Sequence, residues 1–126
     1  MDAAEALAQR VLAHRAARHP SWATLVGLPG HDHELRATTR ASFEEEAREI
    51  EALLREAEAL PASLDREALT TQLALELFEL REVRSWARNP DLASDFFDHL
   101  FSLLLAAHLA PDARAAALLA RLEGAP

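Results

Sequence analysis

The sequence lacks cysteine, lysine and tyrosine entirely. Without cysteine, disulfide bonds, thiolate zinc sites and cysteine nucleophiles are excluded within this sequence. All 13 basic residues are therefore arginines, which we attribute to a GC-rich genome rather than to function. Only 3 glycines and 6% aromatic residues are present, whereas alanine, leucine, glutamate and arginine dominate. Because these four residues are strong or adequate helix formers, the composition predicts an all-α fold.

The net charge and the hydropathy of the sequence argue against nucleic-acid and membrane partners for this protein. The net charge of −8 argues against a nucleic-acid partner, because nucleic-acid binding favours a basic patch. The most apolar run, 96–110, contains Asp98, His99 and His108. It falls short of the roughly 20 apolar residues that a membrane-spanning helix needs. The N-terminal segment also lacks the uninterrupted apolar core of a signal peptide. We therefore expect a cytoplasmic protein with no membrane partner.

Apolar spacing, prolines and capping residues divide the sequence into predicted helices. Ser42 and Glu45 match a capping box at the start of the second helix, and Ser63 or Asp65 can cap the third. Short connections favour an antiparallel bundle of about five helices in a single domain, residues 1–126. The predicted helices cover about residues 3–18, 42–60, 64–88, 90–108 and 111–123.

Two segments stand out from this pattern. Residues 73–83 are apolar on nearly every side, which predicts a helix buried by neighbours at the centre of the fold. Residues 20–38 hold two of the three glycines and predict one long loop between the first two helices. Within that loop, Trp22–Val26 could form a single helical turn.

Histidines beside carboxylates give two candidate metal sites. His31, Asp32 and His33 lie in the long loop, but nothing nearby supplies a positioned third ligand, so a polar loop is favoured. Asp95 and His99 are one turn apart on a predicted helix and share a face. A carboxylate that orients a surface histidine is the commoner arrangement at that spacing. We therefore expect no metal or other cofactor, and keep His31, His33, Asp95 and His99 only as candidate ligands.

A stripe of glutamates is the best candidate for an internal polar feature. Glu76, Glu79 and Glu82 recur every three residues on the otherwise apolar third helix, where they could line a cleft or a metal site. Di-metal bundles need Glu-x-x-His on facing helices, and that motif does not occur in the sequence. Arg81 and Arg84 can pair with these acids, so an ion-paired, solvated stripe is favoured.

Catalytic motifs are absent from the sequence. It contains no glycine-rich phosphate loop, no Gly-x-Ser-x-Gly elbow and no His-Glu-x-x-His pair. Trp22 and Trp86 are predicted to be packing anchors rather than ligand platforms. We therefore predict that this chain is not an enzyme.

Leucines are concentrated in the last two predicted helices. These helices contain more leucines than one face of each helix can bury within a monomer, so a homodimer could bury the remaining leucines. The expected interface consists of Leu103, Leu104, Leu105, Leu109, Leu118, Leu119 and Leu122.

Short motifs along residues 15–126 together resemble a known family. They are Pro20, Ala23-Thr24, Gly27 and Asp32, then Leu64-Asp65, Phe78-Glu79-Leu80, Trp86 and Asn89-Pro90, then Ala110-Pro111 and Arg121-Leu122. In this order and spacing they resemble the N-terminal region of the bacterial family called domain of unknown function 885. Asp91-Leu92 departs from that pattern, because aromatic residues are expected after Asn-Pro.

The resemblance implies a role without catalysis. Members of that family resemble zinc metallopeptidases, whose His-Glu-x-x-His helix comes much later in a far longer chain. Their N-terminal helices wall one side of a deep substrate cleft, so no catalytic residue is carried over to this sequence. Three functions are therefore considered: a cleft-wall domain that packs against a C-terminal catalytic part, a stand-alone homodimerising interaction module, and a small metal-binding helical bundle.

Overall fold

The computed structural model describes residues 1–125, apart from the side chain of Ala93. The prediction of an all-α protein is confirmed, because helices account for 74% of the structure and the described residues form no strand. The chain divides into two compact units. Unit 1 comprises Met1–Ala13 and Thr38–Asn89, and unit 2 comprises His14–Ala37 and Pro90–Pro126, of which Pro126 lies outside the described residues. No helix in the described part is both long enough and apolar enough to cross a bilayer.

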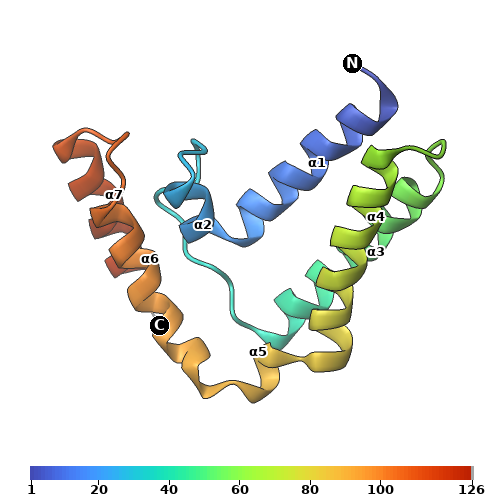
Figure 1. Cartoon of the computed structure of the whole chain (residues 1–126). Helices are drawn as coiled ribbons and strands as arrows, with labels where there is room; N and C mark the ends of the chain where they lie inside the picture. Colours follow the sequence, from blue (N-terminus) through green and yellow to red (C-terminus); the bar gives the residue numbers. More distant parts are fainter. Residues whose placement is uncertain (126) are drawn as a thin grey trace. The chain divides into compact units, whose positions relative to one another are not determined.

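Unit 1 is built on an antiparallel helix pair, α3 (Arg40–Glu58) and α4 (Leu64–Phe78) (Figure 1). The first part of α1 (Ala3–Arg18) packs against this pair, and its Arg10 Nη1 lies 2.5 Å from Glu56 Oε2 of α3. The described core of this unit consists of Leu7, Ile50, Leu53, Ala57 and Leu73.

Side-chain caps fix where the two paired helices begin. Ser63 Oγ accepts a hydrogen bond from the backbone N–H of Arg66 at 3.1 Å, as the sequence suggests for α4. The second helix begins two residues before the predicted start, because the hydroxyl of Thr39 caps it by accepting from the N–H of Ser42 at 3.1 Å. Ser42 therefore lies within the first turn of α3 rather than at its cap, and α3 ends at Glu58 instead of residue 60.

The predicted single helix 64–88 is interrupted. After α4 the chain forms a π-helical turn, η1 (Glu79–Val83), and then a short helix, α5 (Ser85–Arg88). Arg84 between them has φ 56° and ψ 47°, a left-handed conformation that cannot continue an α-helix. Its N–H donates to the carbonyl of Glu79 at 2.8 Å, which closes the wider turn.

The apolar sequence of residues 73–83 predicts a helix that is buried on nearly every side, and the structure shows that this prediction is wrong. Leu73 is 1% exposed, whereas Leu75 is 60% and Phe78 is 56% exposed. The reason is that α4 has one face against α3 in unit 1, so only residues on that face become core.

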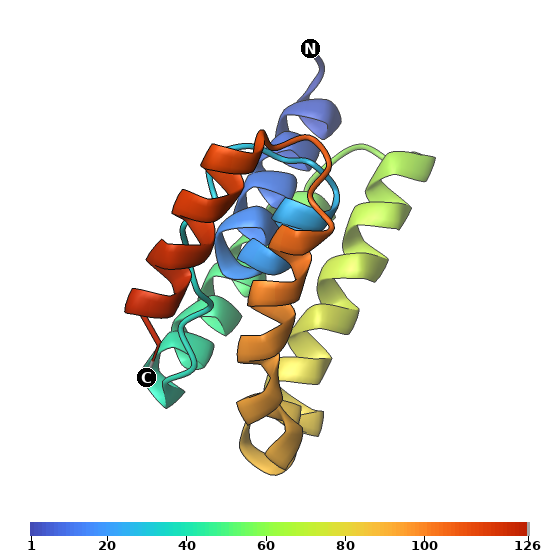
Figure 2. The same cartoon turned by 90° about the vertical axis from the view of Figure 1, so that its left-hand side faces the viewer.

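Unit 2 contains α2 (Pro20–Leu25), a 3-10 helix η2 (Pro90–Ser94), α6 (Asp95–Leu104) and α7 (Pro111–Glu123). Helix α6 contacts both α2 and α7, and it runs antiparallel to α7 (Figure 2). The predicted long loop therefore begins with a helix, and the predicted helix 90–108 begins as a 3-10 turn and ends at Leu104. The turn after α6 is held by Arg114, whose Nη2 donates to the carbonyls of Ala106 and Leu109 at 3.0 and 3.2 Å. The bounds of α1 and α7 coincide with the predicted ones.

Candidate functional site

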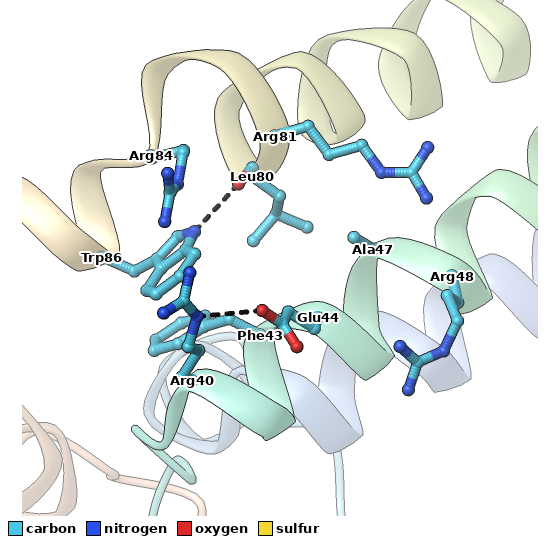
Figure 3. Close-up of a pocket in the computed structure, with 9 residues that line it drawn as sticks. All are labelled: Arg40, Phe43, Glu44, Ala47, Arg48, Leu80, Arg81, Arg84 and Trp86. Carbon is cyan, nitrogen blue, oxygen red and sulfur yellow. Dashed lines mark hydrogen bonds and ion pairs between the residues drawn. The ribbon is translucent and has the colours of Figure 1, made fainter.

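A pocket of about 320 Å³ opens between α3 and the η1–α5 segment of unit 1 (Figure 3). Helix α3 contributes Arg40, Phe43, Glu44, Ala47 and Arg48. The segment opposite contributes Leu80, Arg81, Arg84 and Trp86. Its volume lies at the lower end of the range of small-molecule sites, so the pocket suits a small ligand.

Trp86 organises one end of this pocket. Its ring stacks on Phe43, with the centroids 5.1 Å apart and the planes at 15°. The indole Nε1–H donates to the carbonyl of Leu80 at 2.8 Å, which ties α5 back to the π-helical turn. The guanidinium of Arg84 lies 5.0 Å from the centroid of the same ring. Trp86 is thus a packing anchor, as predicted, and it also positions a cation at the pocket.

The backbone at Arg84 is strained. A left-handed conformation costs a residue other than glycine about 1–2 kcal/mol, because its Cβ crowds the neighbouring carbonyl. Arg84 is the one described residue other than glycine with a positive φ. Such strain, and π-helical turns like η1, are concentrated at functional sites. Residues 79–86 therefore contain both the irregular backbone and one wall of the pocket.

Arginines gather around the pocket although acidic residues outnumber arginines in unit 1. Four arginines and one glutamate line it. Arg40 Nε donates to Glu44 Oε1 at 3.0 Å. Arg81 Nη2 donates to Glu51 Oε2 at 3.0 Å, and this bond raises the pKa of Arg81 and lowers the pKa of Glu51. Two of the four guanidinium groups are therefore neutralised by a neighbouring carboxylate.

The other two arginines have no carboxylate partner. Arg48 is exposed and makes no hydrogen bond or ion pair with the described residues. Arg84 is half-buried, and its side chain contacts the face of the Trp86 ring. Guanidinium groups stay protonated and donate several hydrogen bonds in one plane, so they recognise carboxylate and phosphate groups. The pocket can consequently bind an anion.

The predicted glutamate stripe lies outside the pocket. Glu79 and Glu82 are exposed, and Glu76 accepts a hydrogen bond from Gln72 Nε2 at 2.7 Å. None of the three lines the pocket. Arg81, considered from the sequence only as a partner for these acids, forms its hydrogen bond with Glu51 on α3 instead.

The four candidate metal ligands do not converge. His31 Nδ1 lies 2.8 Å from Glu34 Oε2, and His33 is exposed. Asp95 and His99 both lie on α6, but no hydrogen bond joins them in the described structure. Across residues 1–125, no group of three or more histidine, aspartate or glutamate side chains is arranged to hold a metal ion.

His99 is nevertheless an unusual residue. It is 5% exposed, and its Nδ1 is buried with no hydrogen-bond partner among the described residues. Burial, together with the positive charge of Arg121, lowers the pKa of His99 to about 4. Burial also raises the pKa of Asp95, and the nearby carboxylate of Asp98 adds to that shift. His99 is therefore a neutral core residue at neutral pH rather than an oriented surface histidine.

Sequence reasoning missed the buried arginine at the centre of unit 2. Arg121 is 0% exposed, and burial lowers its pKa below the ordinary value. Its Nε donates to the carbonyl of Glu34 at 2.9 Å, and its Nη1 donates to the carbonyl of His99 and to Ser102 Oγ. These acceptors come from the loop before α3 and from α6, so Arg121 positions the loop against the helices. The sequence does contain one indication of this burial. Arg121 lies four residues after Ala117, so the two share a face of α7, and that face is buried.

The seven leucines of the expected interface differ in exposure. Leu103 is fully buried in unit 2, so it cannot belong to an interface, and Leu109 and Leu118 are half-buried. Exposed fractions are 58% for Leu104, 56% for Leu105, 57% for Leu119 and 46% for Leu122. Phe97 and Phe101, which were not included, are 69% and 56% exposed. We call the exposed residues Phe97, Phe101, Leu104 and Leu105, which share one side of α6, the apolar face of unit 2.

Comparison with known proteins adds no relative. No protein-family model matches the chain, and no curated protein or solved structure is significantly similar to it. The family resemblance inferred from short motifs stays a prediction, and functional arguments must rest on the arginine-lined pocket and on the apolar face of unit 2.

Proposed function

We propose that the chain is a non-catalytic helical domain that packs against another protein surface through the apolar face of unit 2. Phe97, Phe101 and Leu104 follow one another at intervals of four and three residues, so they share one face of α6. All three are more than half exposed. Fully burying one such side chain contributes about 1.5–3 kcal/mol, so covering the stripe favours association.

The occupant that we propose is the C-terminal catalytic part of a metallopeptidase-like protein. This proposal rests on the resemblance to domain of unknown function 885, in which the N-terminal helices form a cleft wall. It assigns no catalytic role to the described chain, because the polar lining of its pocket is mostly arginine. Arginine remains protonated and is therefore a poor general acid or base.

A homodimer is the second candidate. The apolar face of unit 2 is large relative to its charge, since exposed Asp98 is the charged residue of α6 beside Phe101 and Leu105, so a second copy can cover it. The metal-binding bundle is not pursued, because the candidate ligands do not converge among residues 1–125. We place the domain in the cytoplasm, without a nucleic-acid or membrane partner, and propose that its helices form an antiparallel bundle of about five.

Size-exclusion chromatography with light scattering, combined with binding of a hydrophobic dye, tests this proposal. We expect a monomer whose dye fluorescence falls in Phe101→Ser and is unchanged in Leu64→Ser. Leu64 is the matched control, because it is a 79% exposed leucine of unit 1 and does not belong to the apolar face. A dimer that Phe101→Ser dissociates favours the second candidate. A monomer that binds no dye contradicts both.

A further inference from the structure

We propose that the arginine-lined pocket of unit 1 binds a small organic dicarboxylate, with one carboxylate at each end of the pocket and an apolar body between them. This inference is independent of the apolar face of unit 2, because every residue that carries it belongs to unit 1.

The two ends of the pocket are separated along α3. Arg40 and Arg48 lie about two turns apart on this helix, or roughly 12 Å along its axis. In Figure 3, Arg40 and Arg84 lie at the end marked by Trp86, and Arg48 and Arg81 lie at the opposite end. The lining is thus basic at both ends rather than at a single point.

Each end has one guanidinium group without a carboxylate partner. At the Trp86 end, Arg40 is paired with Glu44, which leaves Arg84. At the opposite end, Arg81 is paired with Glu51, which leaves Arg48. One uncompensated positive charge at each end matches a ligand with one negative charge at each end. The planar guanidinium group suits a carboxylate, which it can bind through two parallel hydrogen bonds.

The middle of the pocket is apolar apart from Glu44, whose carboxylate accepts a hydrogen bond from Arg40. Leu80 and Ala47 lie between the two ends in Figure 3. A hydrocarbon body fits this region, whereas a compact ion such as inorganic phosphate can occupy only one end. Trp86 is not a stacking platform for the ligand, because one face of its ring contacts Phe43 and Arg84 covers the ring as well. Its role is to hold Arg84 in position.

The fluorescence of Trp86 can be used to measure ligand binding in the pocket. In a Trp22→Phe background of the full chain, Trp86 is the only tryptophan, so its fluorescence reports on the pocket. Adipate, suberate and sebacate are titrated as dicarboxylates of increasing length, with octanoate and inorganic phosphate as ligands that have a single anionic group. We expect saturable binding of one dicarboxylate at least about tenfold tighter than octanoate or phosphate, since the second charge-assisted contact is lost with those two.

Variants at the two ends test the assignment. Arg48→Gln and Arg84→Gly should each weaken dicarboxylate binding by about tenfold or more, to the level of octanoate. Arg84→Gly removes the guanidinium while relieving the left-handed backbone, so lost binding cannot be assigned to misfolding. Arg88→Gln, an exposed arginine on α5 outside the pocket lining, is the matched control and should bind as the parent does.

Three outcomes would overturn the proposal. One is that no dicarboxylate changes the Trp86 signal or produces heat in calorimetry. Another is that octanoate or phosphate binds as tightly as the best dicarboxylate. The third is that Arg88→Gln weakens binding as much as Arg48→Gln, which would assign the effect to net charge rather than to the pocket.

Discussion

The guanidinium of Arg121 donates a hydrogen bond to the hydroxyl of Thr24 at 2.8 Å, and that hydroxyl lies 2.8 Å from Asp32 Oδ1. Thr24 therefore connects a buried cation on α7 with a carboxylate in the loop before α3, although neither ionic group contacts the other directly. This arrangement satisfies the polar atoms of three separate segments of unit 2. It also explains how a loop that follows the short helix α2 is held in place.

Replacement of Arg121 by methionine should destabilise the protein strongly. The variant fills much of the same volume but removes the side-chain donor to the carbonyl of Glu34, to the hydroxyl of Thr24 and, beside Ser102 Oγ, to the carbonyl of His99. Each buried unsatisfied polar group costs about 1–3 kcal/mol, so we expect a loss of about 3 kcal/mol in the free energy of unfolding. Urea denaturation followed by circular dichroism measures the change.

Arg88→Met provides the control for this substitution, because Arg88 is exposed on α5 and should change stability by no more than about 0.5 kcal/mol. Arg121→Lys should recover part of the loss, since it keeps the charge but has fewer donors in a different geometry. Equal urea midpoints for wild type and Arg121→Met would contradict the proposed role of Arg121.

The neutral, buried His99 predicts how stability depends on pH. Its pKa is about 4 in the folded protein and 6.5 by reference, so the unfolded chain binds more protons between these values. Stability is therefore full above pH 6.5 and falls as the pH is lowered towards 4. The contribution that is lost over this window is about 2–3 kcal/mol.

Urea midpoints of wild type and His99→Leu, measured from pH 7 down to pH 4.5, test this dependence. The variant should show a shallower decline, because it has no imidazole to protonate. It should also be tolerated at pH 7, since Nδ1 of His99 has no partner to lose among the described residues. Parallel pH profiles for the two proteins would show that His99 does not control the decline.

Local signals in the sequence were sufficient for some elements. Proline at residue 111 and the apolar spacing that follows set the bounds of α7, and Ser63 caps α4 as expected. The start of α3 was misplaced because the hydroxyls of Thr39 and Ser42 are both good caps, and sequence alone does not decide between them. The bounds of a helix can thus be predicted from sequence where a single capping or proline signal is present, and not where two capping residues lie close together.

The break at Arg84 and the pocket beside it depend on tertiary structure. No local signal marks an arginine for a left-handed backbone, and Glu79–Val83 consists largely of residues compatible with an α-helix. The conformation is supported by Trp86, which bonds to the carbonyl of Leu80 and stacks on Phe43 of α3. The grouping of arginines likewise arises only when α3 packs against η1.

Adjacent leucines on α6 should respond very differently to truncation. Leu103 is 0% exposed and Leu104 is 58% exposed. Leu103→Ala should cost about 2–5 kcal/mol, because it removes core contacts and leaves a cavity. Leu104→Ala should change stability by about 0.5 kcal/mol or less. Urea denaturation of the two variants distinguishes this arrangement from the predicted interface that contained both leucines; similar losses would contradict the described orientation of α6.

Glycine and alanine should rank in opposite orders at two neighbouring arginines. At Arg84, where φ is 56°, glycine adopts the left-handed backbone without strain, so Arg84→Gly should be about 1 kcal/mol more stable than Arg84→Ala. Both variants lose the contact with Trp86, so that loss cancels in the comparison. At Arg88, the last residue of α5 and not among the residues with positive φ, alanine should be more stable than glycine by up to about 0.5 kcal/mol.

Opposite rankings of glycine and alanine at positions 84 and 88 are informative, because a general preference of the protein for glycine or for alanine would give the same ranking at both positions. Thermal or urea unfolding of the four variants gives the two differences directly. If alanine is the more stable replacement at both positions, Arg84 does not hold a left-handed backbone and the π-helical turn continues into α5 as regular helix. If glycine is favoured at Arg84 alone, the strained residue belongs to the folded state, and its guanidinium is held at the pocket by that backbone.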